Sequence, residues 1–268
     1  MRKAWTGNAT ASRHETVNPA SQPIPHALIL AAGIGRRCGL DHPKALLEFG
    51  GRSLLERHLL LLRACGVERV TLAIGHQGDR LRAAARRAAA GLALDFVENP
   101  RYLEGSVVTL WTLREALTAG DPVLLMDADV LYDRRMLDRL LGSRHENVFL
   151  LDRRFEPGDE PVKLCVRGGR LAEFRKRVCG SFDYCGESVG FFRFGPEKAA
   201  ELARLTERYL ERGRGDAPYE EAVRDMLLAD PDAFGWEDVT GLPWTEIDFP
   251  EDVRHARDRI LPALRPLD

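Results

Sequence analysis

The chain has little of what marks secreted, membrane-bound or nucleic-acid-binding proteins. Its five cysteines among 268 residues are odd in number and scattered, with no C-x-x-C pair. Neither a disulfide framework nor a zinc site is therefore predicted, and a reducing cytoplasm is the expected location. No apolar run reaches the roughly 18 residues of a membrane-spanning helix. The formal net charge of −2 gives no field that would favour nucleic acid or an anionic membrane as a partner.

Residues 1–25 also lack the apolar core of a signal peptide and any clear periodicity, and we expect them to form a disordered extension. Residues 26–265 are long enough for a single large domain. We divide this domain into a nucleotide-binding half, 26–150, and a half that binds the acceptor and completes the metal site, 151–265. The apolar helix faces serve a core or a homodimer equally well, so the oligomeric state stays open.

What the sequence does contain is a regular alternation of short apolar runs and amphipathic segments. The runs predicted to be strands are Ala27–Ala31, Val70–Ile74, Leu92–Val97 and Val123–Met126. A capping box, Ser53-Leu54-Leu55-Glu56, opens a helix that stops at Gly66. Gly168 and Gly169, between two alternating runs, predict a hairpin. Because each buried strand is followed by a helix, the pattern predicts an α/β fold with a Rossmann-like, doubly wound, mostly parallel sheet. Its ligands should bind at the carboxyl ends of the strands.

The first predicted strand leads directly into a glycine-rich, cationic loop. Gly33 and Gly35 allow the backbone to approach a ligand closely. The loop also carries three positive charges, which are Arg36, Arg37 and Lys44. It lacks the third glycine of the dinucleotide fingerprint and the Gly-Lys-Ser/Thr of the P-loop. The loop therefore predicts a polyphosphate site of another kind.

Carboxylates mark a second candidate site. Asp127 and Asp129 follow the fourth predicted strand, and they point the same way if the strand geometry continues. Two carboxylates on one side suit Mg²⁺, which keeps several waters and also binds substrate phosphate oxygens. Far downstream, an alternating segment carries Glu246 and Asp248 on one face, ahead of a helix begun by Pro250. On the residues alone, Asp248 could equally serve as a helix cap.

The order of these features resembles that of nucleotidyltransferases that join an NTP to a sugar phosphate or another small phosphorylated compound. The resemblance covers His26 to about Leu261 and is closest to the branch of the phosphocholine and 2-aminoethylphosphonate cytidylyltransferases. It implies a fold of the nucleotide-diphospho-sugar transferase type with an inserted acceptor-binding lobe. Besides the loop, the segments that carry it are Asp127-Ala-Asp129, Glu160-Pro-Val-Lys163, Gly186-Glu187-Ser188-Val-Gly190, Pro218-Tyr219-Glu220-Glu221 and Trp244-Thr-Glu246-Ile-Asp248.

The resemblance implies roles for individual residues. Asp129 and Asp248 would bind Mg²⁺, the expected cofactor, and Arg37 and Lys44 would be the catalytic cations. Gly105 and Ser106 would lie beside the nucleobase or ribose, although both residues are also typical of an ordinary helix start. The nucleotide-binding set is Leu30, Ala31, Ala32, Gly33, Gly35, Arg37, Lys44, Gly105, Ser106 and Asp127.

The expected activity is a Mg-dependent transfer of CMP from CTP to a small phosphonate or phosphate, such as 2-aminoethylphosphonate or phosphocholine, with release of pyrophosphate. A zwitterionic acceptor of this kind needs a cation for one end and a carboxylate or aromatic face for the other. Lys163 is the candidate for the cation at the first end. It lies in the alternating, strand-like run Pro161–Val166, where a lysine side chain normally faces the solvent. Glu187, Tyr219 and Glu220 are the candidates for the second. The loop Arg175–Tyr184 is predicted to cover the acceptor.

Other activities remain open at this stage. A sugar-1-phosphate or inositol-1-phosphate nucleotidyltransferase would keep the chemistry and change the acceptor. A non-catalytic, nucleotide-binding regulatory protein on the same fold would not need the intact set of Arg37, Lys44, Asp129 and Asp248. A molybdopterin-type nucleotide transfer fits the long region after Asp129 poorly.

Overall fold

The computed structural model describes residues 23–89, 91–155, 158 and 160–267. The predicted N-terminal extension lies outside the described residues except for its last three positions. None of the described helices has the length and apolar character needed to cross a membrane.

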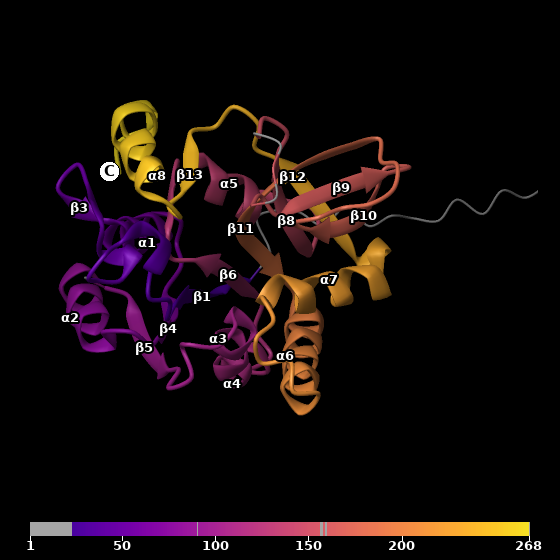
Figure 1. Cartoon of the computed structure of the whole chain (residues 1–268), viewed down its shortest axis with the longest axis horizontal. Helices are drawn as coiled ribbons and strands as arrows, with labels where there is room; N and C mark the ends of the chain where they lie inside the picture. Colours follow the sequence, from indigo (N-terminus) through magenta and orange to yellow (C-terminus); the bar gives the residue numbers. More distant parts are fainter. Residues whose placement is uncertain (1–22, 90, 156–157, 159, 268) are drawn as a thin grey trace, which may run out of the picture.

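A nine-stranded sheet forms the centre of the molecule (Figure 1). Four neighbouring parallel strands of this sheet are the ones that the sequence predicts, in the spatial order β6-β1-β4-β5. Their bounds are β1 His26–Ala31, β4 Arg69–Ile74, β5 Ala93–Glu98 and β6 Val123–Asp127. Every one of these strands is mostly apolar, and the central two are almost fully buried, as expected of a sheet covered on both faces.

The second half of the chain extends this sheet. Strand β11 pairs with β6 in the antiparallel sense, and it also pairs with β8 and β9. The second half of the domain is therefore continuous with the sheet, rather than a separate inserted lobe. The fold class predicted from the sequence is confirmed, with this difference in how the second half is attached. The added strands are β8 Asn147–Asp152, β9 Lys163–Arg167, β10 Arg170–Arg175, β11 Tyr184–Phe194 and β12 Phe234–Asp238.

Helices cover both faces of the sheet. One apolar core lies between the sheet and α1 Leu54–Ala64, α2 Gly78–Ala88 and α5 Arg135–Gly142. The core on the other face is formed with α3 Ser106–Thr112, α4 Arg114–Leu117, α6 Pro196–Glu211 and α7 Tyr219–Ala229. The remaining elements are β2 Glu48–Phe49, β3 Arg52–Ser53, β7 Val130–Tyr132, β13 Trp244–Glu246 and α8 Pro250–His255, with short 3-10 turns at Arg36–Cys38, Lys44–Leu46, Pro231–Ala233 and Leu261–Ala263 and a π turn at Ala256–Ile260.

Two local predictions are confirmed. At the start of α1 the Ser53 Oγ accepts from the Glu56 backbone N–H at 3.2 Å, and the Glu56 carboxylate accepts from the Ser53 N–H at 2.7 Å. This is the predicted capping box. Gly168 and Gly169 both have positive φ, +59° and +73°, and join β9 to β10 in the predicted hairpin.

The cysteine prediction was wrong. Cys165 of β9 and Cys185 of β11 lie directly opposite each other and form a disulfide. The bond closes a ring that contains the β9–β10 hairpin and the loop before β11. Sequence spacing gave no sign of it, because the two cysteines are brought together only by the register of two strands. The cysteine pattern therefore no longer supports the expectation of a reducing compartment.

Candidate active site

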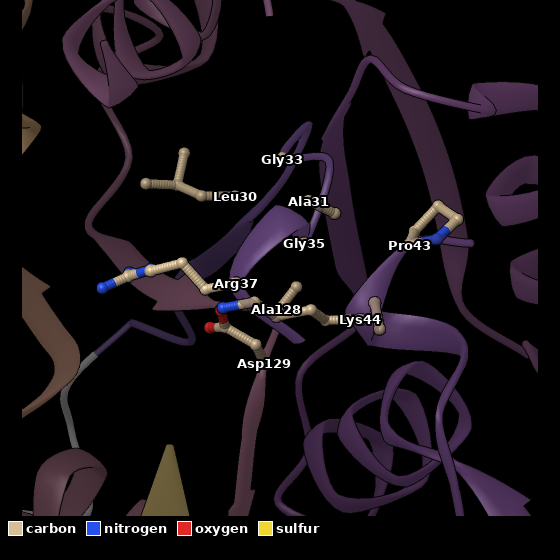
Figure 2. A pocket seen from close by; sticks show the side chains of 10 residues that line it. Leu30, Ala31, Gly33, Gly35, Arg37, Pro43, Lys44, Ala128 and Asp129 are labelled. Atoms are coloured by element: carbon tan, nitrogen blue, oxygen red, sulfur yellow. The ribbon is translucent and has the colours of Figure 1, made fainter. Parts of the chain in front are cut away.

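The glycine-rich loop borders a cavity of about 200 Å³ at the carboxyl end of β1. Gly35 has φ +71°, and a Cβ there would lie 3.0 Å from the Lys44 Cγ, so both backbone and space favour glycine. The predicted Ala32 is buried behind the loop and does not line the cavity. Figure 2 shows the residues that do line it, which are Leu30, Ala31, Gly33, Gly35, Arg37, Pro43, Lys44, Ala45, Ala128 and Asp129.

The Lys44 ammonium joins the two predicted metal ligands. Its Nζ lies 2.8 Å from the Asp129 Oδ2 and 2.6 Å from the Asp248 Oδ1, although these carboxylates are far apart in sequence. In Figure 2 the Lys44 side chain reaches across the cavity to Asp129. Burial by itself lowers the pKa of Lys44, but the charges of Asp129 and Asp248 more than reverse this, so the pKa lies above its ordinary value. Lys44 is therefore a permanent cation.

Asp129 and Asp248 come together because β13 pairs with β7. The register places Glu246 opposite Val130, and the Ile247 N–H donates to the Asp129 carbonyl at 3.0 Å. Each of Asp129, Glu246 and Asp248 offers a carboxylate oxygen, and these oxygens lie within 4.8 Å of one another. This donor set fits a hard cation such as Mg²⁺.

Glu246 was not among the predicted ligands. The signal was available, since the alternation of the segment already placed it on the same face as Asp248. Although part of the Glu246 side chain is exposed to solvent, partial loss of hydration at its carboxylate, followed by the charges of Asp129 and Asp248, raises the pKa of Glu246 above its usual range.

Arg37 connects the loop to the second half of the domain. Its guanidinium forms ion pairs with Glu160 and Asp248, both at 2.9 Å, and lies 5.3 Å from the centre of the Phe249 ring. The Arg37 side chain remains 48% exposed. It is thus held beside the carboxylate cluster and is still open to a ligand.

Asp127 and Asp129 do not face the same partner. Strand β6 ends at Asp127, so the strand alternation stops before Asp129. The Asp127 Oδ2 accepts a 2.7 Å hydrogen bond from the Tyr219 hydroxyl, and Asp127 lies outside the three-carboxylate group. Together with Tyr219 and Glu220 it lines a second cavity of about 100 Å³ between β11 and α7. We call this the α7 cavity.

The four predicted acceptor residues divide between two places. Tyr219 and Glu220 line the α7 cavity, whereas Glu187 lines a different cavity of about 570 Å³. Lys163 is opposite Glu187 in the β9–β11 ladder. The Lys163 ammonium donates to three backbone carbonyls, those of Gly158 at 2.6 Å, Lys176 at 2.6 Å and Pro161 at 3.4 Å. These bonds give Lys163 a structural role.

Burial, with a smaller contribution from the charge of Asp152, raises the pKa of Glu187 to about 7.

Gly105 and Ser106 pack against the segment that leads into α7. A Cβ on Gly105 would lie 2.2 Å from the Ala217 carbonyl oxygen, so only glycine fits there. The Ser106 Oγ accepts from the Tyr219 backbone N–H at 2.9 Å instead of capping α3, whose N-cap is Gly105. These contacts fix the position of the start of α7, which lines the α7 cavity. A role for either residue at the base or ribose stays a prediction.

Two curated proteins are similar to the chain over most of its length. A CMP-5'-(3-aminopropyl)phosphonate synthase from Streptomyces rubellomurinus is 30% identical over 91% of this chain and 40% of its own length. A bifunctional IPC transferase and DIPP synthase from Rubrobacter xylanophilus is 30% identical over 88% of this chain and 52% of its own length. The chain thus spans about half the length of these relatives.

The fold is also that of solved nucleotidyltransferases. The inositol-1-phosphate CTP transferase from T. maritima superposes with a TM-score of 0.71 at 20% identity, covering 91% of this chain and all of the other. These similarities confirm the resemblance drawn from the loop and the carboxylate segments. The model of the MobA-like NTP transferase domain matches residues 27–183. Since that match spans more than half of the chain, the protein belongs to the MobA-like NTP transferase domain family.

Proposed function

We propose that the protein is a cytidylyltransferase that transfers CMP from CTP to a small phosphonate or phosphate and releases pyrophosphate. The observation that carries the proposal is the close group of Lys44, Arg37, Asp129, Glu246 and Asp248 at the mouth of the glycine-rich loop. A site with two cations and three carboxylates suits a reaction between two anions, where charge neutralisation is the main requirement.

Asp129, Glu246 and Asp248 would hold the divalent cation. Mg²⁺ bound there would supply Lewis-acid stabilisation of the phosphate oxygens. Lys44 lies 2.6–2.8 Å from two of these carboxylates, so its charge acts on the same phosphate group. Arg37 remains half exposed even with its two ion pairs, so its guanidinium is accessible to the phosphate of either substrate.

The acceptor supplies its own nucleophile. A phosphonate or phosphate oxygen is already ionised near neutral pH, so its attack on the α-phosphorus needs no side-chain base. The protein has to align the oxygen with the leaving pyrophosphate and to exclude water. The α7 cavity shares Arg37 with the cavity of the glycine-rich loop and is also lined by Glu246 and Asp248 of the carboxylate group, so an acceptor held in it would lie against the reacting phosphorus.

The acceptors that we propose are zwitterions, either an aminoalkylphosphonate or phosphocholine. The name of the Streptomyces relative supports the first. The name of the T. maritima structure instead favours inositol-1-phosphate, a neutral polyol with one phosphate, as the second candidate class.

The test is pyrophosphate release by the purified chain with Mg²⁺, each of the four NTPs in turn, and a panel of 2-aminoethylphosphonate, 3-aminopropylphosphonate, phosphocholine, inositol-1-phosphate and glucose-1-phosphate. Release with CTP and a zwitterion is expected, and chelation of the metal should abolish it. Release only with a polyol phosphate would assign the second class. No release with any pair, together with no CTP binding by calorimetry, would refute the proposal.

A further inference from the structure

The α7 cavity has an uneven distribution of charge, which bears on the acceptor of the proposed function. Its two cations, Arg37 and Lys176, lie at the open rim, with side chains 48% and 43% exposed. Less accessible oxygen atoms belong to Asp127, Ser188 and Glu220, and we call this part of the lining the inner end; Ser188 is only 8% exposed, and Glu220 also lines a neighbouring cavity together with Lys176. The cavity therefore combines exposed cations with uncharged or negative oxygen atoms that are largely closed to solvent.

Two of the deep oxygens have no partner within the described residues. The Ser188 Oγ and the Glu220 Oε2 are both inaccessible to solvent and without a hydrogen bond. A buried oxygen left without a partner destabilises the folded protein, and more so when the oxygen carries charge. Buried oxygens are therefore expected to find a donor from a bound molecule.

The neighbouring oxygens are held in place. The Tyr219 hydroxyl uses its only proton on the Asp127 Oδ2, which leaves the other lone pairs of Asp127 as acceptors. Gly190 makes this arrangement possible, because it has φ +78° and a Cβ there would lie 2.2 Å from the Asp127 Oδ2. The inner end of the cavity thus presents acceptors and negative charge, beside the aromatic rings of Phe192 and Tyr219.

We propose, on the basis of the proposed function, that the inner end of the α7 cavity binds a primary ammonium group of the acceptor. An –NH₃⁺ group brings three N–H donors and a positive charge, which match the unpaired oxygens of Ser188 and Glu220 and the carboxylate of Asp127. A trimethylammonium group carries the same charge but no N–H, so it would bury these oxygens without a donor. The acceptor class is therefore an ω-aminoalkyl phosphonate or phosphate, and phosphocholine is excluded.

The rim accounts for the other end of the acceptor. Arg37 and Lys176 pair with the same oxygen of Glu160, at 2.9 Å and 3.2 Å. Arg37 also lies beside the carboxylate cluster. A phosphonate that takes the place of the Glu160 carboxylate between these cations would face the polyphosphate loop while the amine points inward. The separation of the two ends then selects the length of the alkyl chain.

The experiment compares three acceptors that differ at one end only: 3-aminopropylphosphonate, its N,N,N-trimethyl analogue and propylphosphonate. Each is assayed for pyrophosphate release with CTP and for direct binding by calorimetry, so that the inference is measured even without turnover. The variants are Glu220→Gln and Ser188→Ala, with Glu221→Gln as the matched control. Glu221 is next to Glu220 on α7, but its carboxylate is paired with Arg175 at 2.6 Å.

For the wild type we expect the amine to exceed the trimethyl analogue at least 100-fold in kcat/KM and in affinity. Glu220→Gln should lower kcat/KM for the amine about 10- to 100-fold, as expected for a hydrogen bond to a charged group. Ser188→Ala should lower it several-fold, and both variants should lose more activity and affinity with the amine than with propylphosphonate. Glu221→Gln should not alter the ratio between the amine and propylphosphonate.

Equal use of the amine and the trimethyl analogue would overturn the inference and leave the proposed function standing. An unchanged amine affinity in a folded Glu220→Gln protein would do the same. Binding of the amine, lost in Glu220→Gln, without pyrophosphate release from any pair would instead preserve the ammonium site and refute the transferase reaction.

Discussion

Replacement of Lys44 by methionine tests the central electrostatic arrangement of the site. The side chains of Lys44, Asp129 and Asp248 are 14%, 23% and 15% exposed, so the ammonium neutralises two carboxylates that are largely removed from water. Methionine keeps most of the volume and removes the charge. Removing one partner of a buried ion pair costs about 3–5 kcal/mol, and we expect a loss near the lower limit, since both carboxylates retain some solvent.

The reaction should be affected independently of stability. A cation aimed at the reacting phosphate is worth about 3–4 kcal/mol in the transition state, which corresponds to a 10²- to 10³-fold loss in kcat. Mg²⁺ should raise the Tm of Lys44→Met more than that of the wild type, because the cation replaces a missing positive charge between the carboxylates. Urea unfolding, thermal unfolding with and without Mg²⁺, and pyrophosphate release measure the three effects.

Lys198 provides a matched control. Its side chain is 11% exposed and its Nζ also joins two carboxylates, Glu201 at 2.9 Å and Asp230 at 3.0 Å, at a distance from the site. Lys198→Met should also be less stable than the wild type, but its loss should be smaller than that of Lys44→Met because the partner carboxylates are more exposed. Its turnover should not change. Full activity in Lys44→Met, or an equal loss of activity in both variants, would refute the reasoning.

Three further outcomes follow from the described residues. Asp129→Ala should lose at least about 2.7 kcal/mol of transition-state stabilisation, roughly a hundredfold in kcat, and near-full activity would show that the metal ligand is misassigned. The Cys165–Cys185 disulfide closes a loop of 20 residues in sequence separation, so a Cys165→Ser/Cys185→Ser protein should unfold about 3 kcal/mol more easily, and an unchanged Tm would contradict the bond. Burial lowers the pKa of His58 from 6.5 to about 4. As the pH falls from 6.5 towards 4, His58 therefore takes up a proton in the unfolded chain but stays neutral in the native state. His58 alone should lower the free energy of unfolding by about 2.5 kcal/mol between pH 7.5 and pH 4.5. In His58→Leu, the free energy of unfolding measured with urea should change less over this pH range.

The parallel strands and the loop were predictable because their signals are local. Apolar runs, Gly35 and the capping box at Ser53 depend on short stretches of sequence, and each was found where the pattern put it. Arg37, Lys44, Asp129 and Asp248 were also predicted, although the convergence of Asp248 on Asp129 rested on the family resemblance.

The surroundings of the predicted acceptor residues were harder to predict, because they depend on the register in which the strands pair. Lys163 and Glu187 share a β-ladder pair, and that position fixes Lys163 on backbone carbonyls and Glu187 in a separate cavity. The disulfide and the divergence of Asp127 from Asp129 have the same origin. Strand pairing decides them, and a single sequence does not display which strands pair or where a strand ends.

The continuity of β11 with the parallel strands has a consequence for how such enzymes diversify. The loop proposed to hold the polyphosphate follows β1, whereas Ser188, Gly190 and Phe192 of β11 and the start of α7 line the α7 cavity, the proposed acceptor site. Changes on the cavity side of β11 can therefore alter the accepted molecule while the groups that perform the chemistry stay in register on the neighbouring strands. A small set of side chains on one strand and one helix turn is enough for a new substrate to evolve, or to be designed, on an unchanged catalytic scaffold.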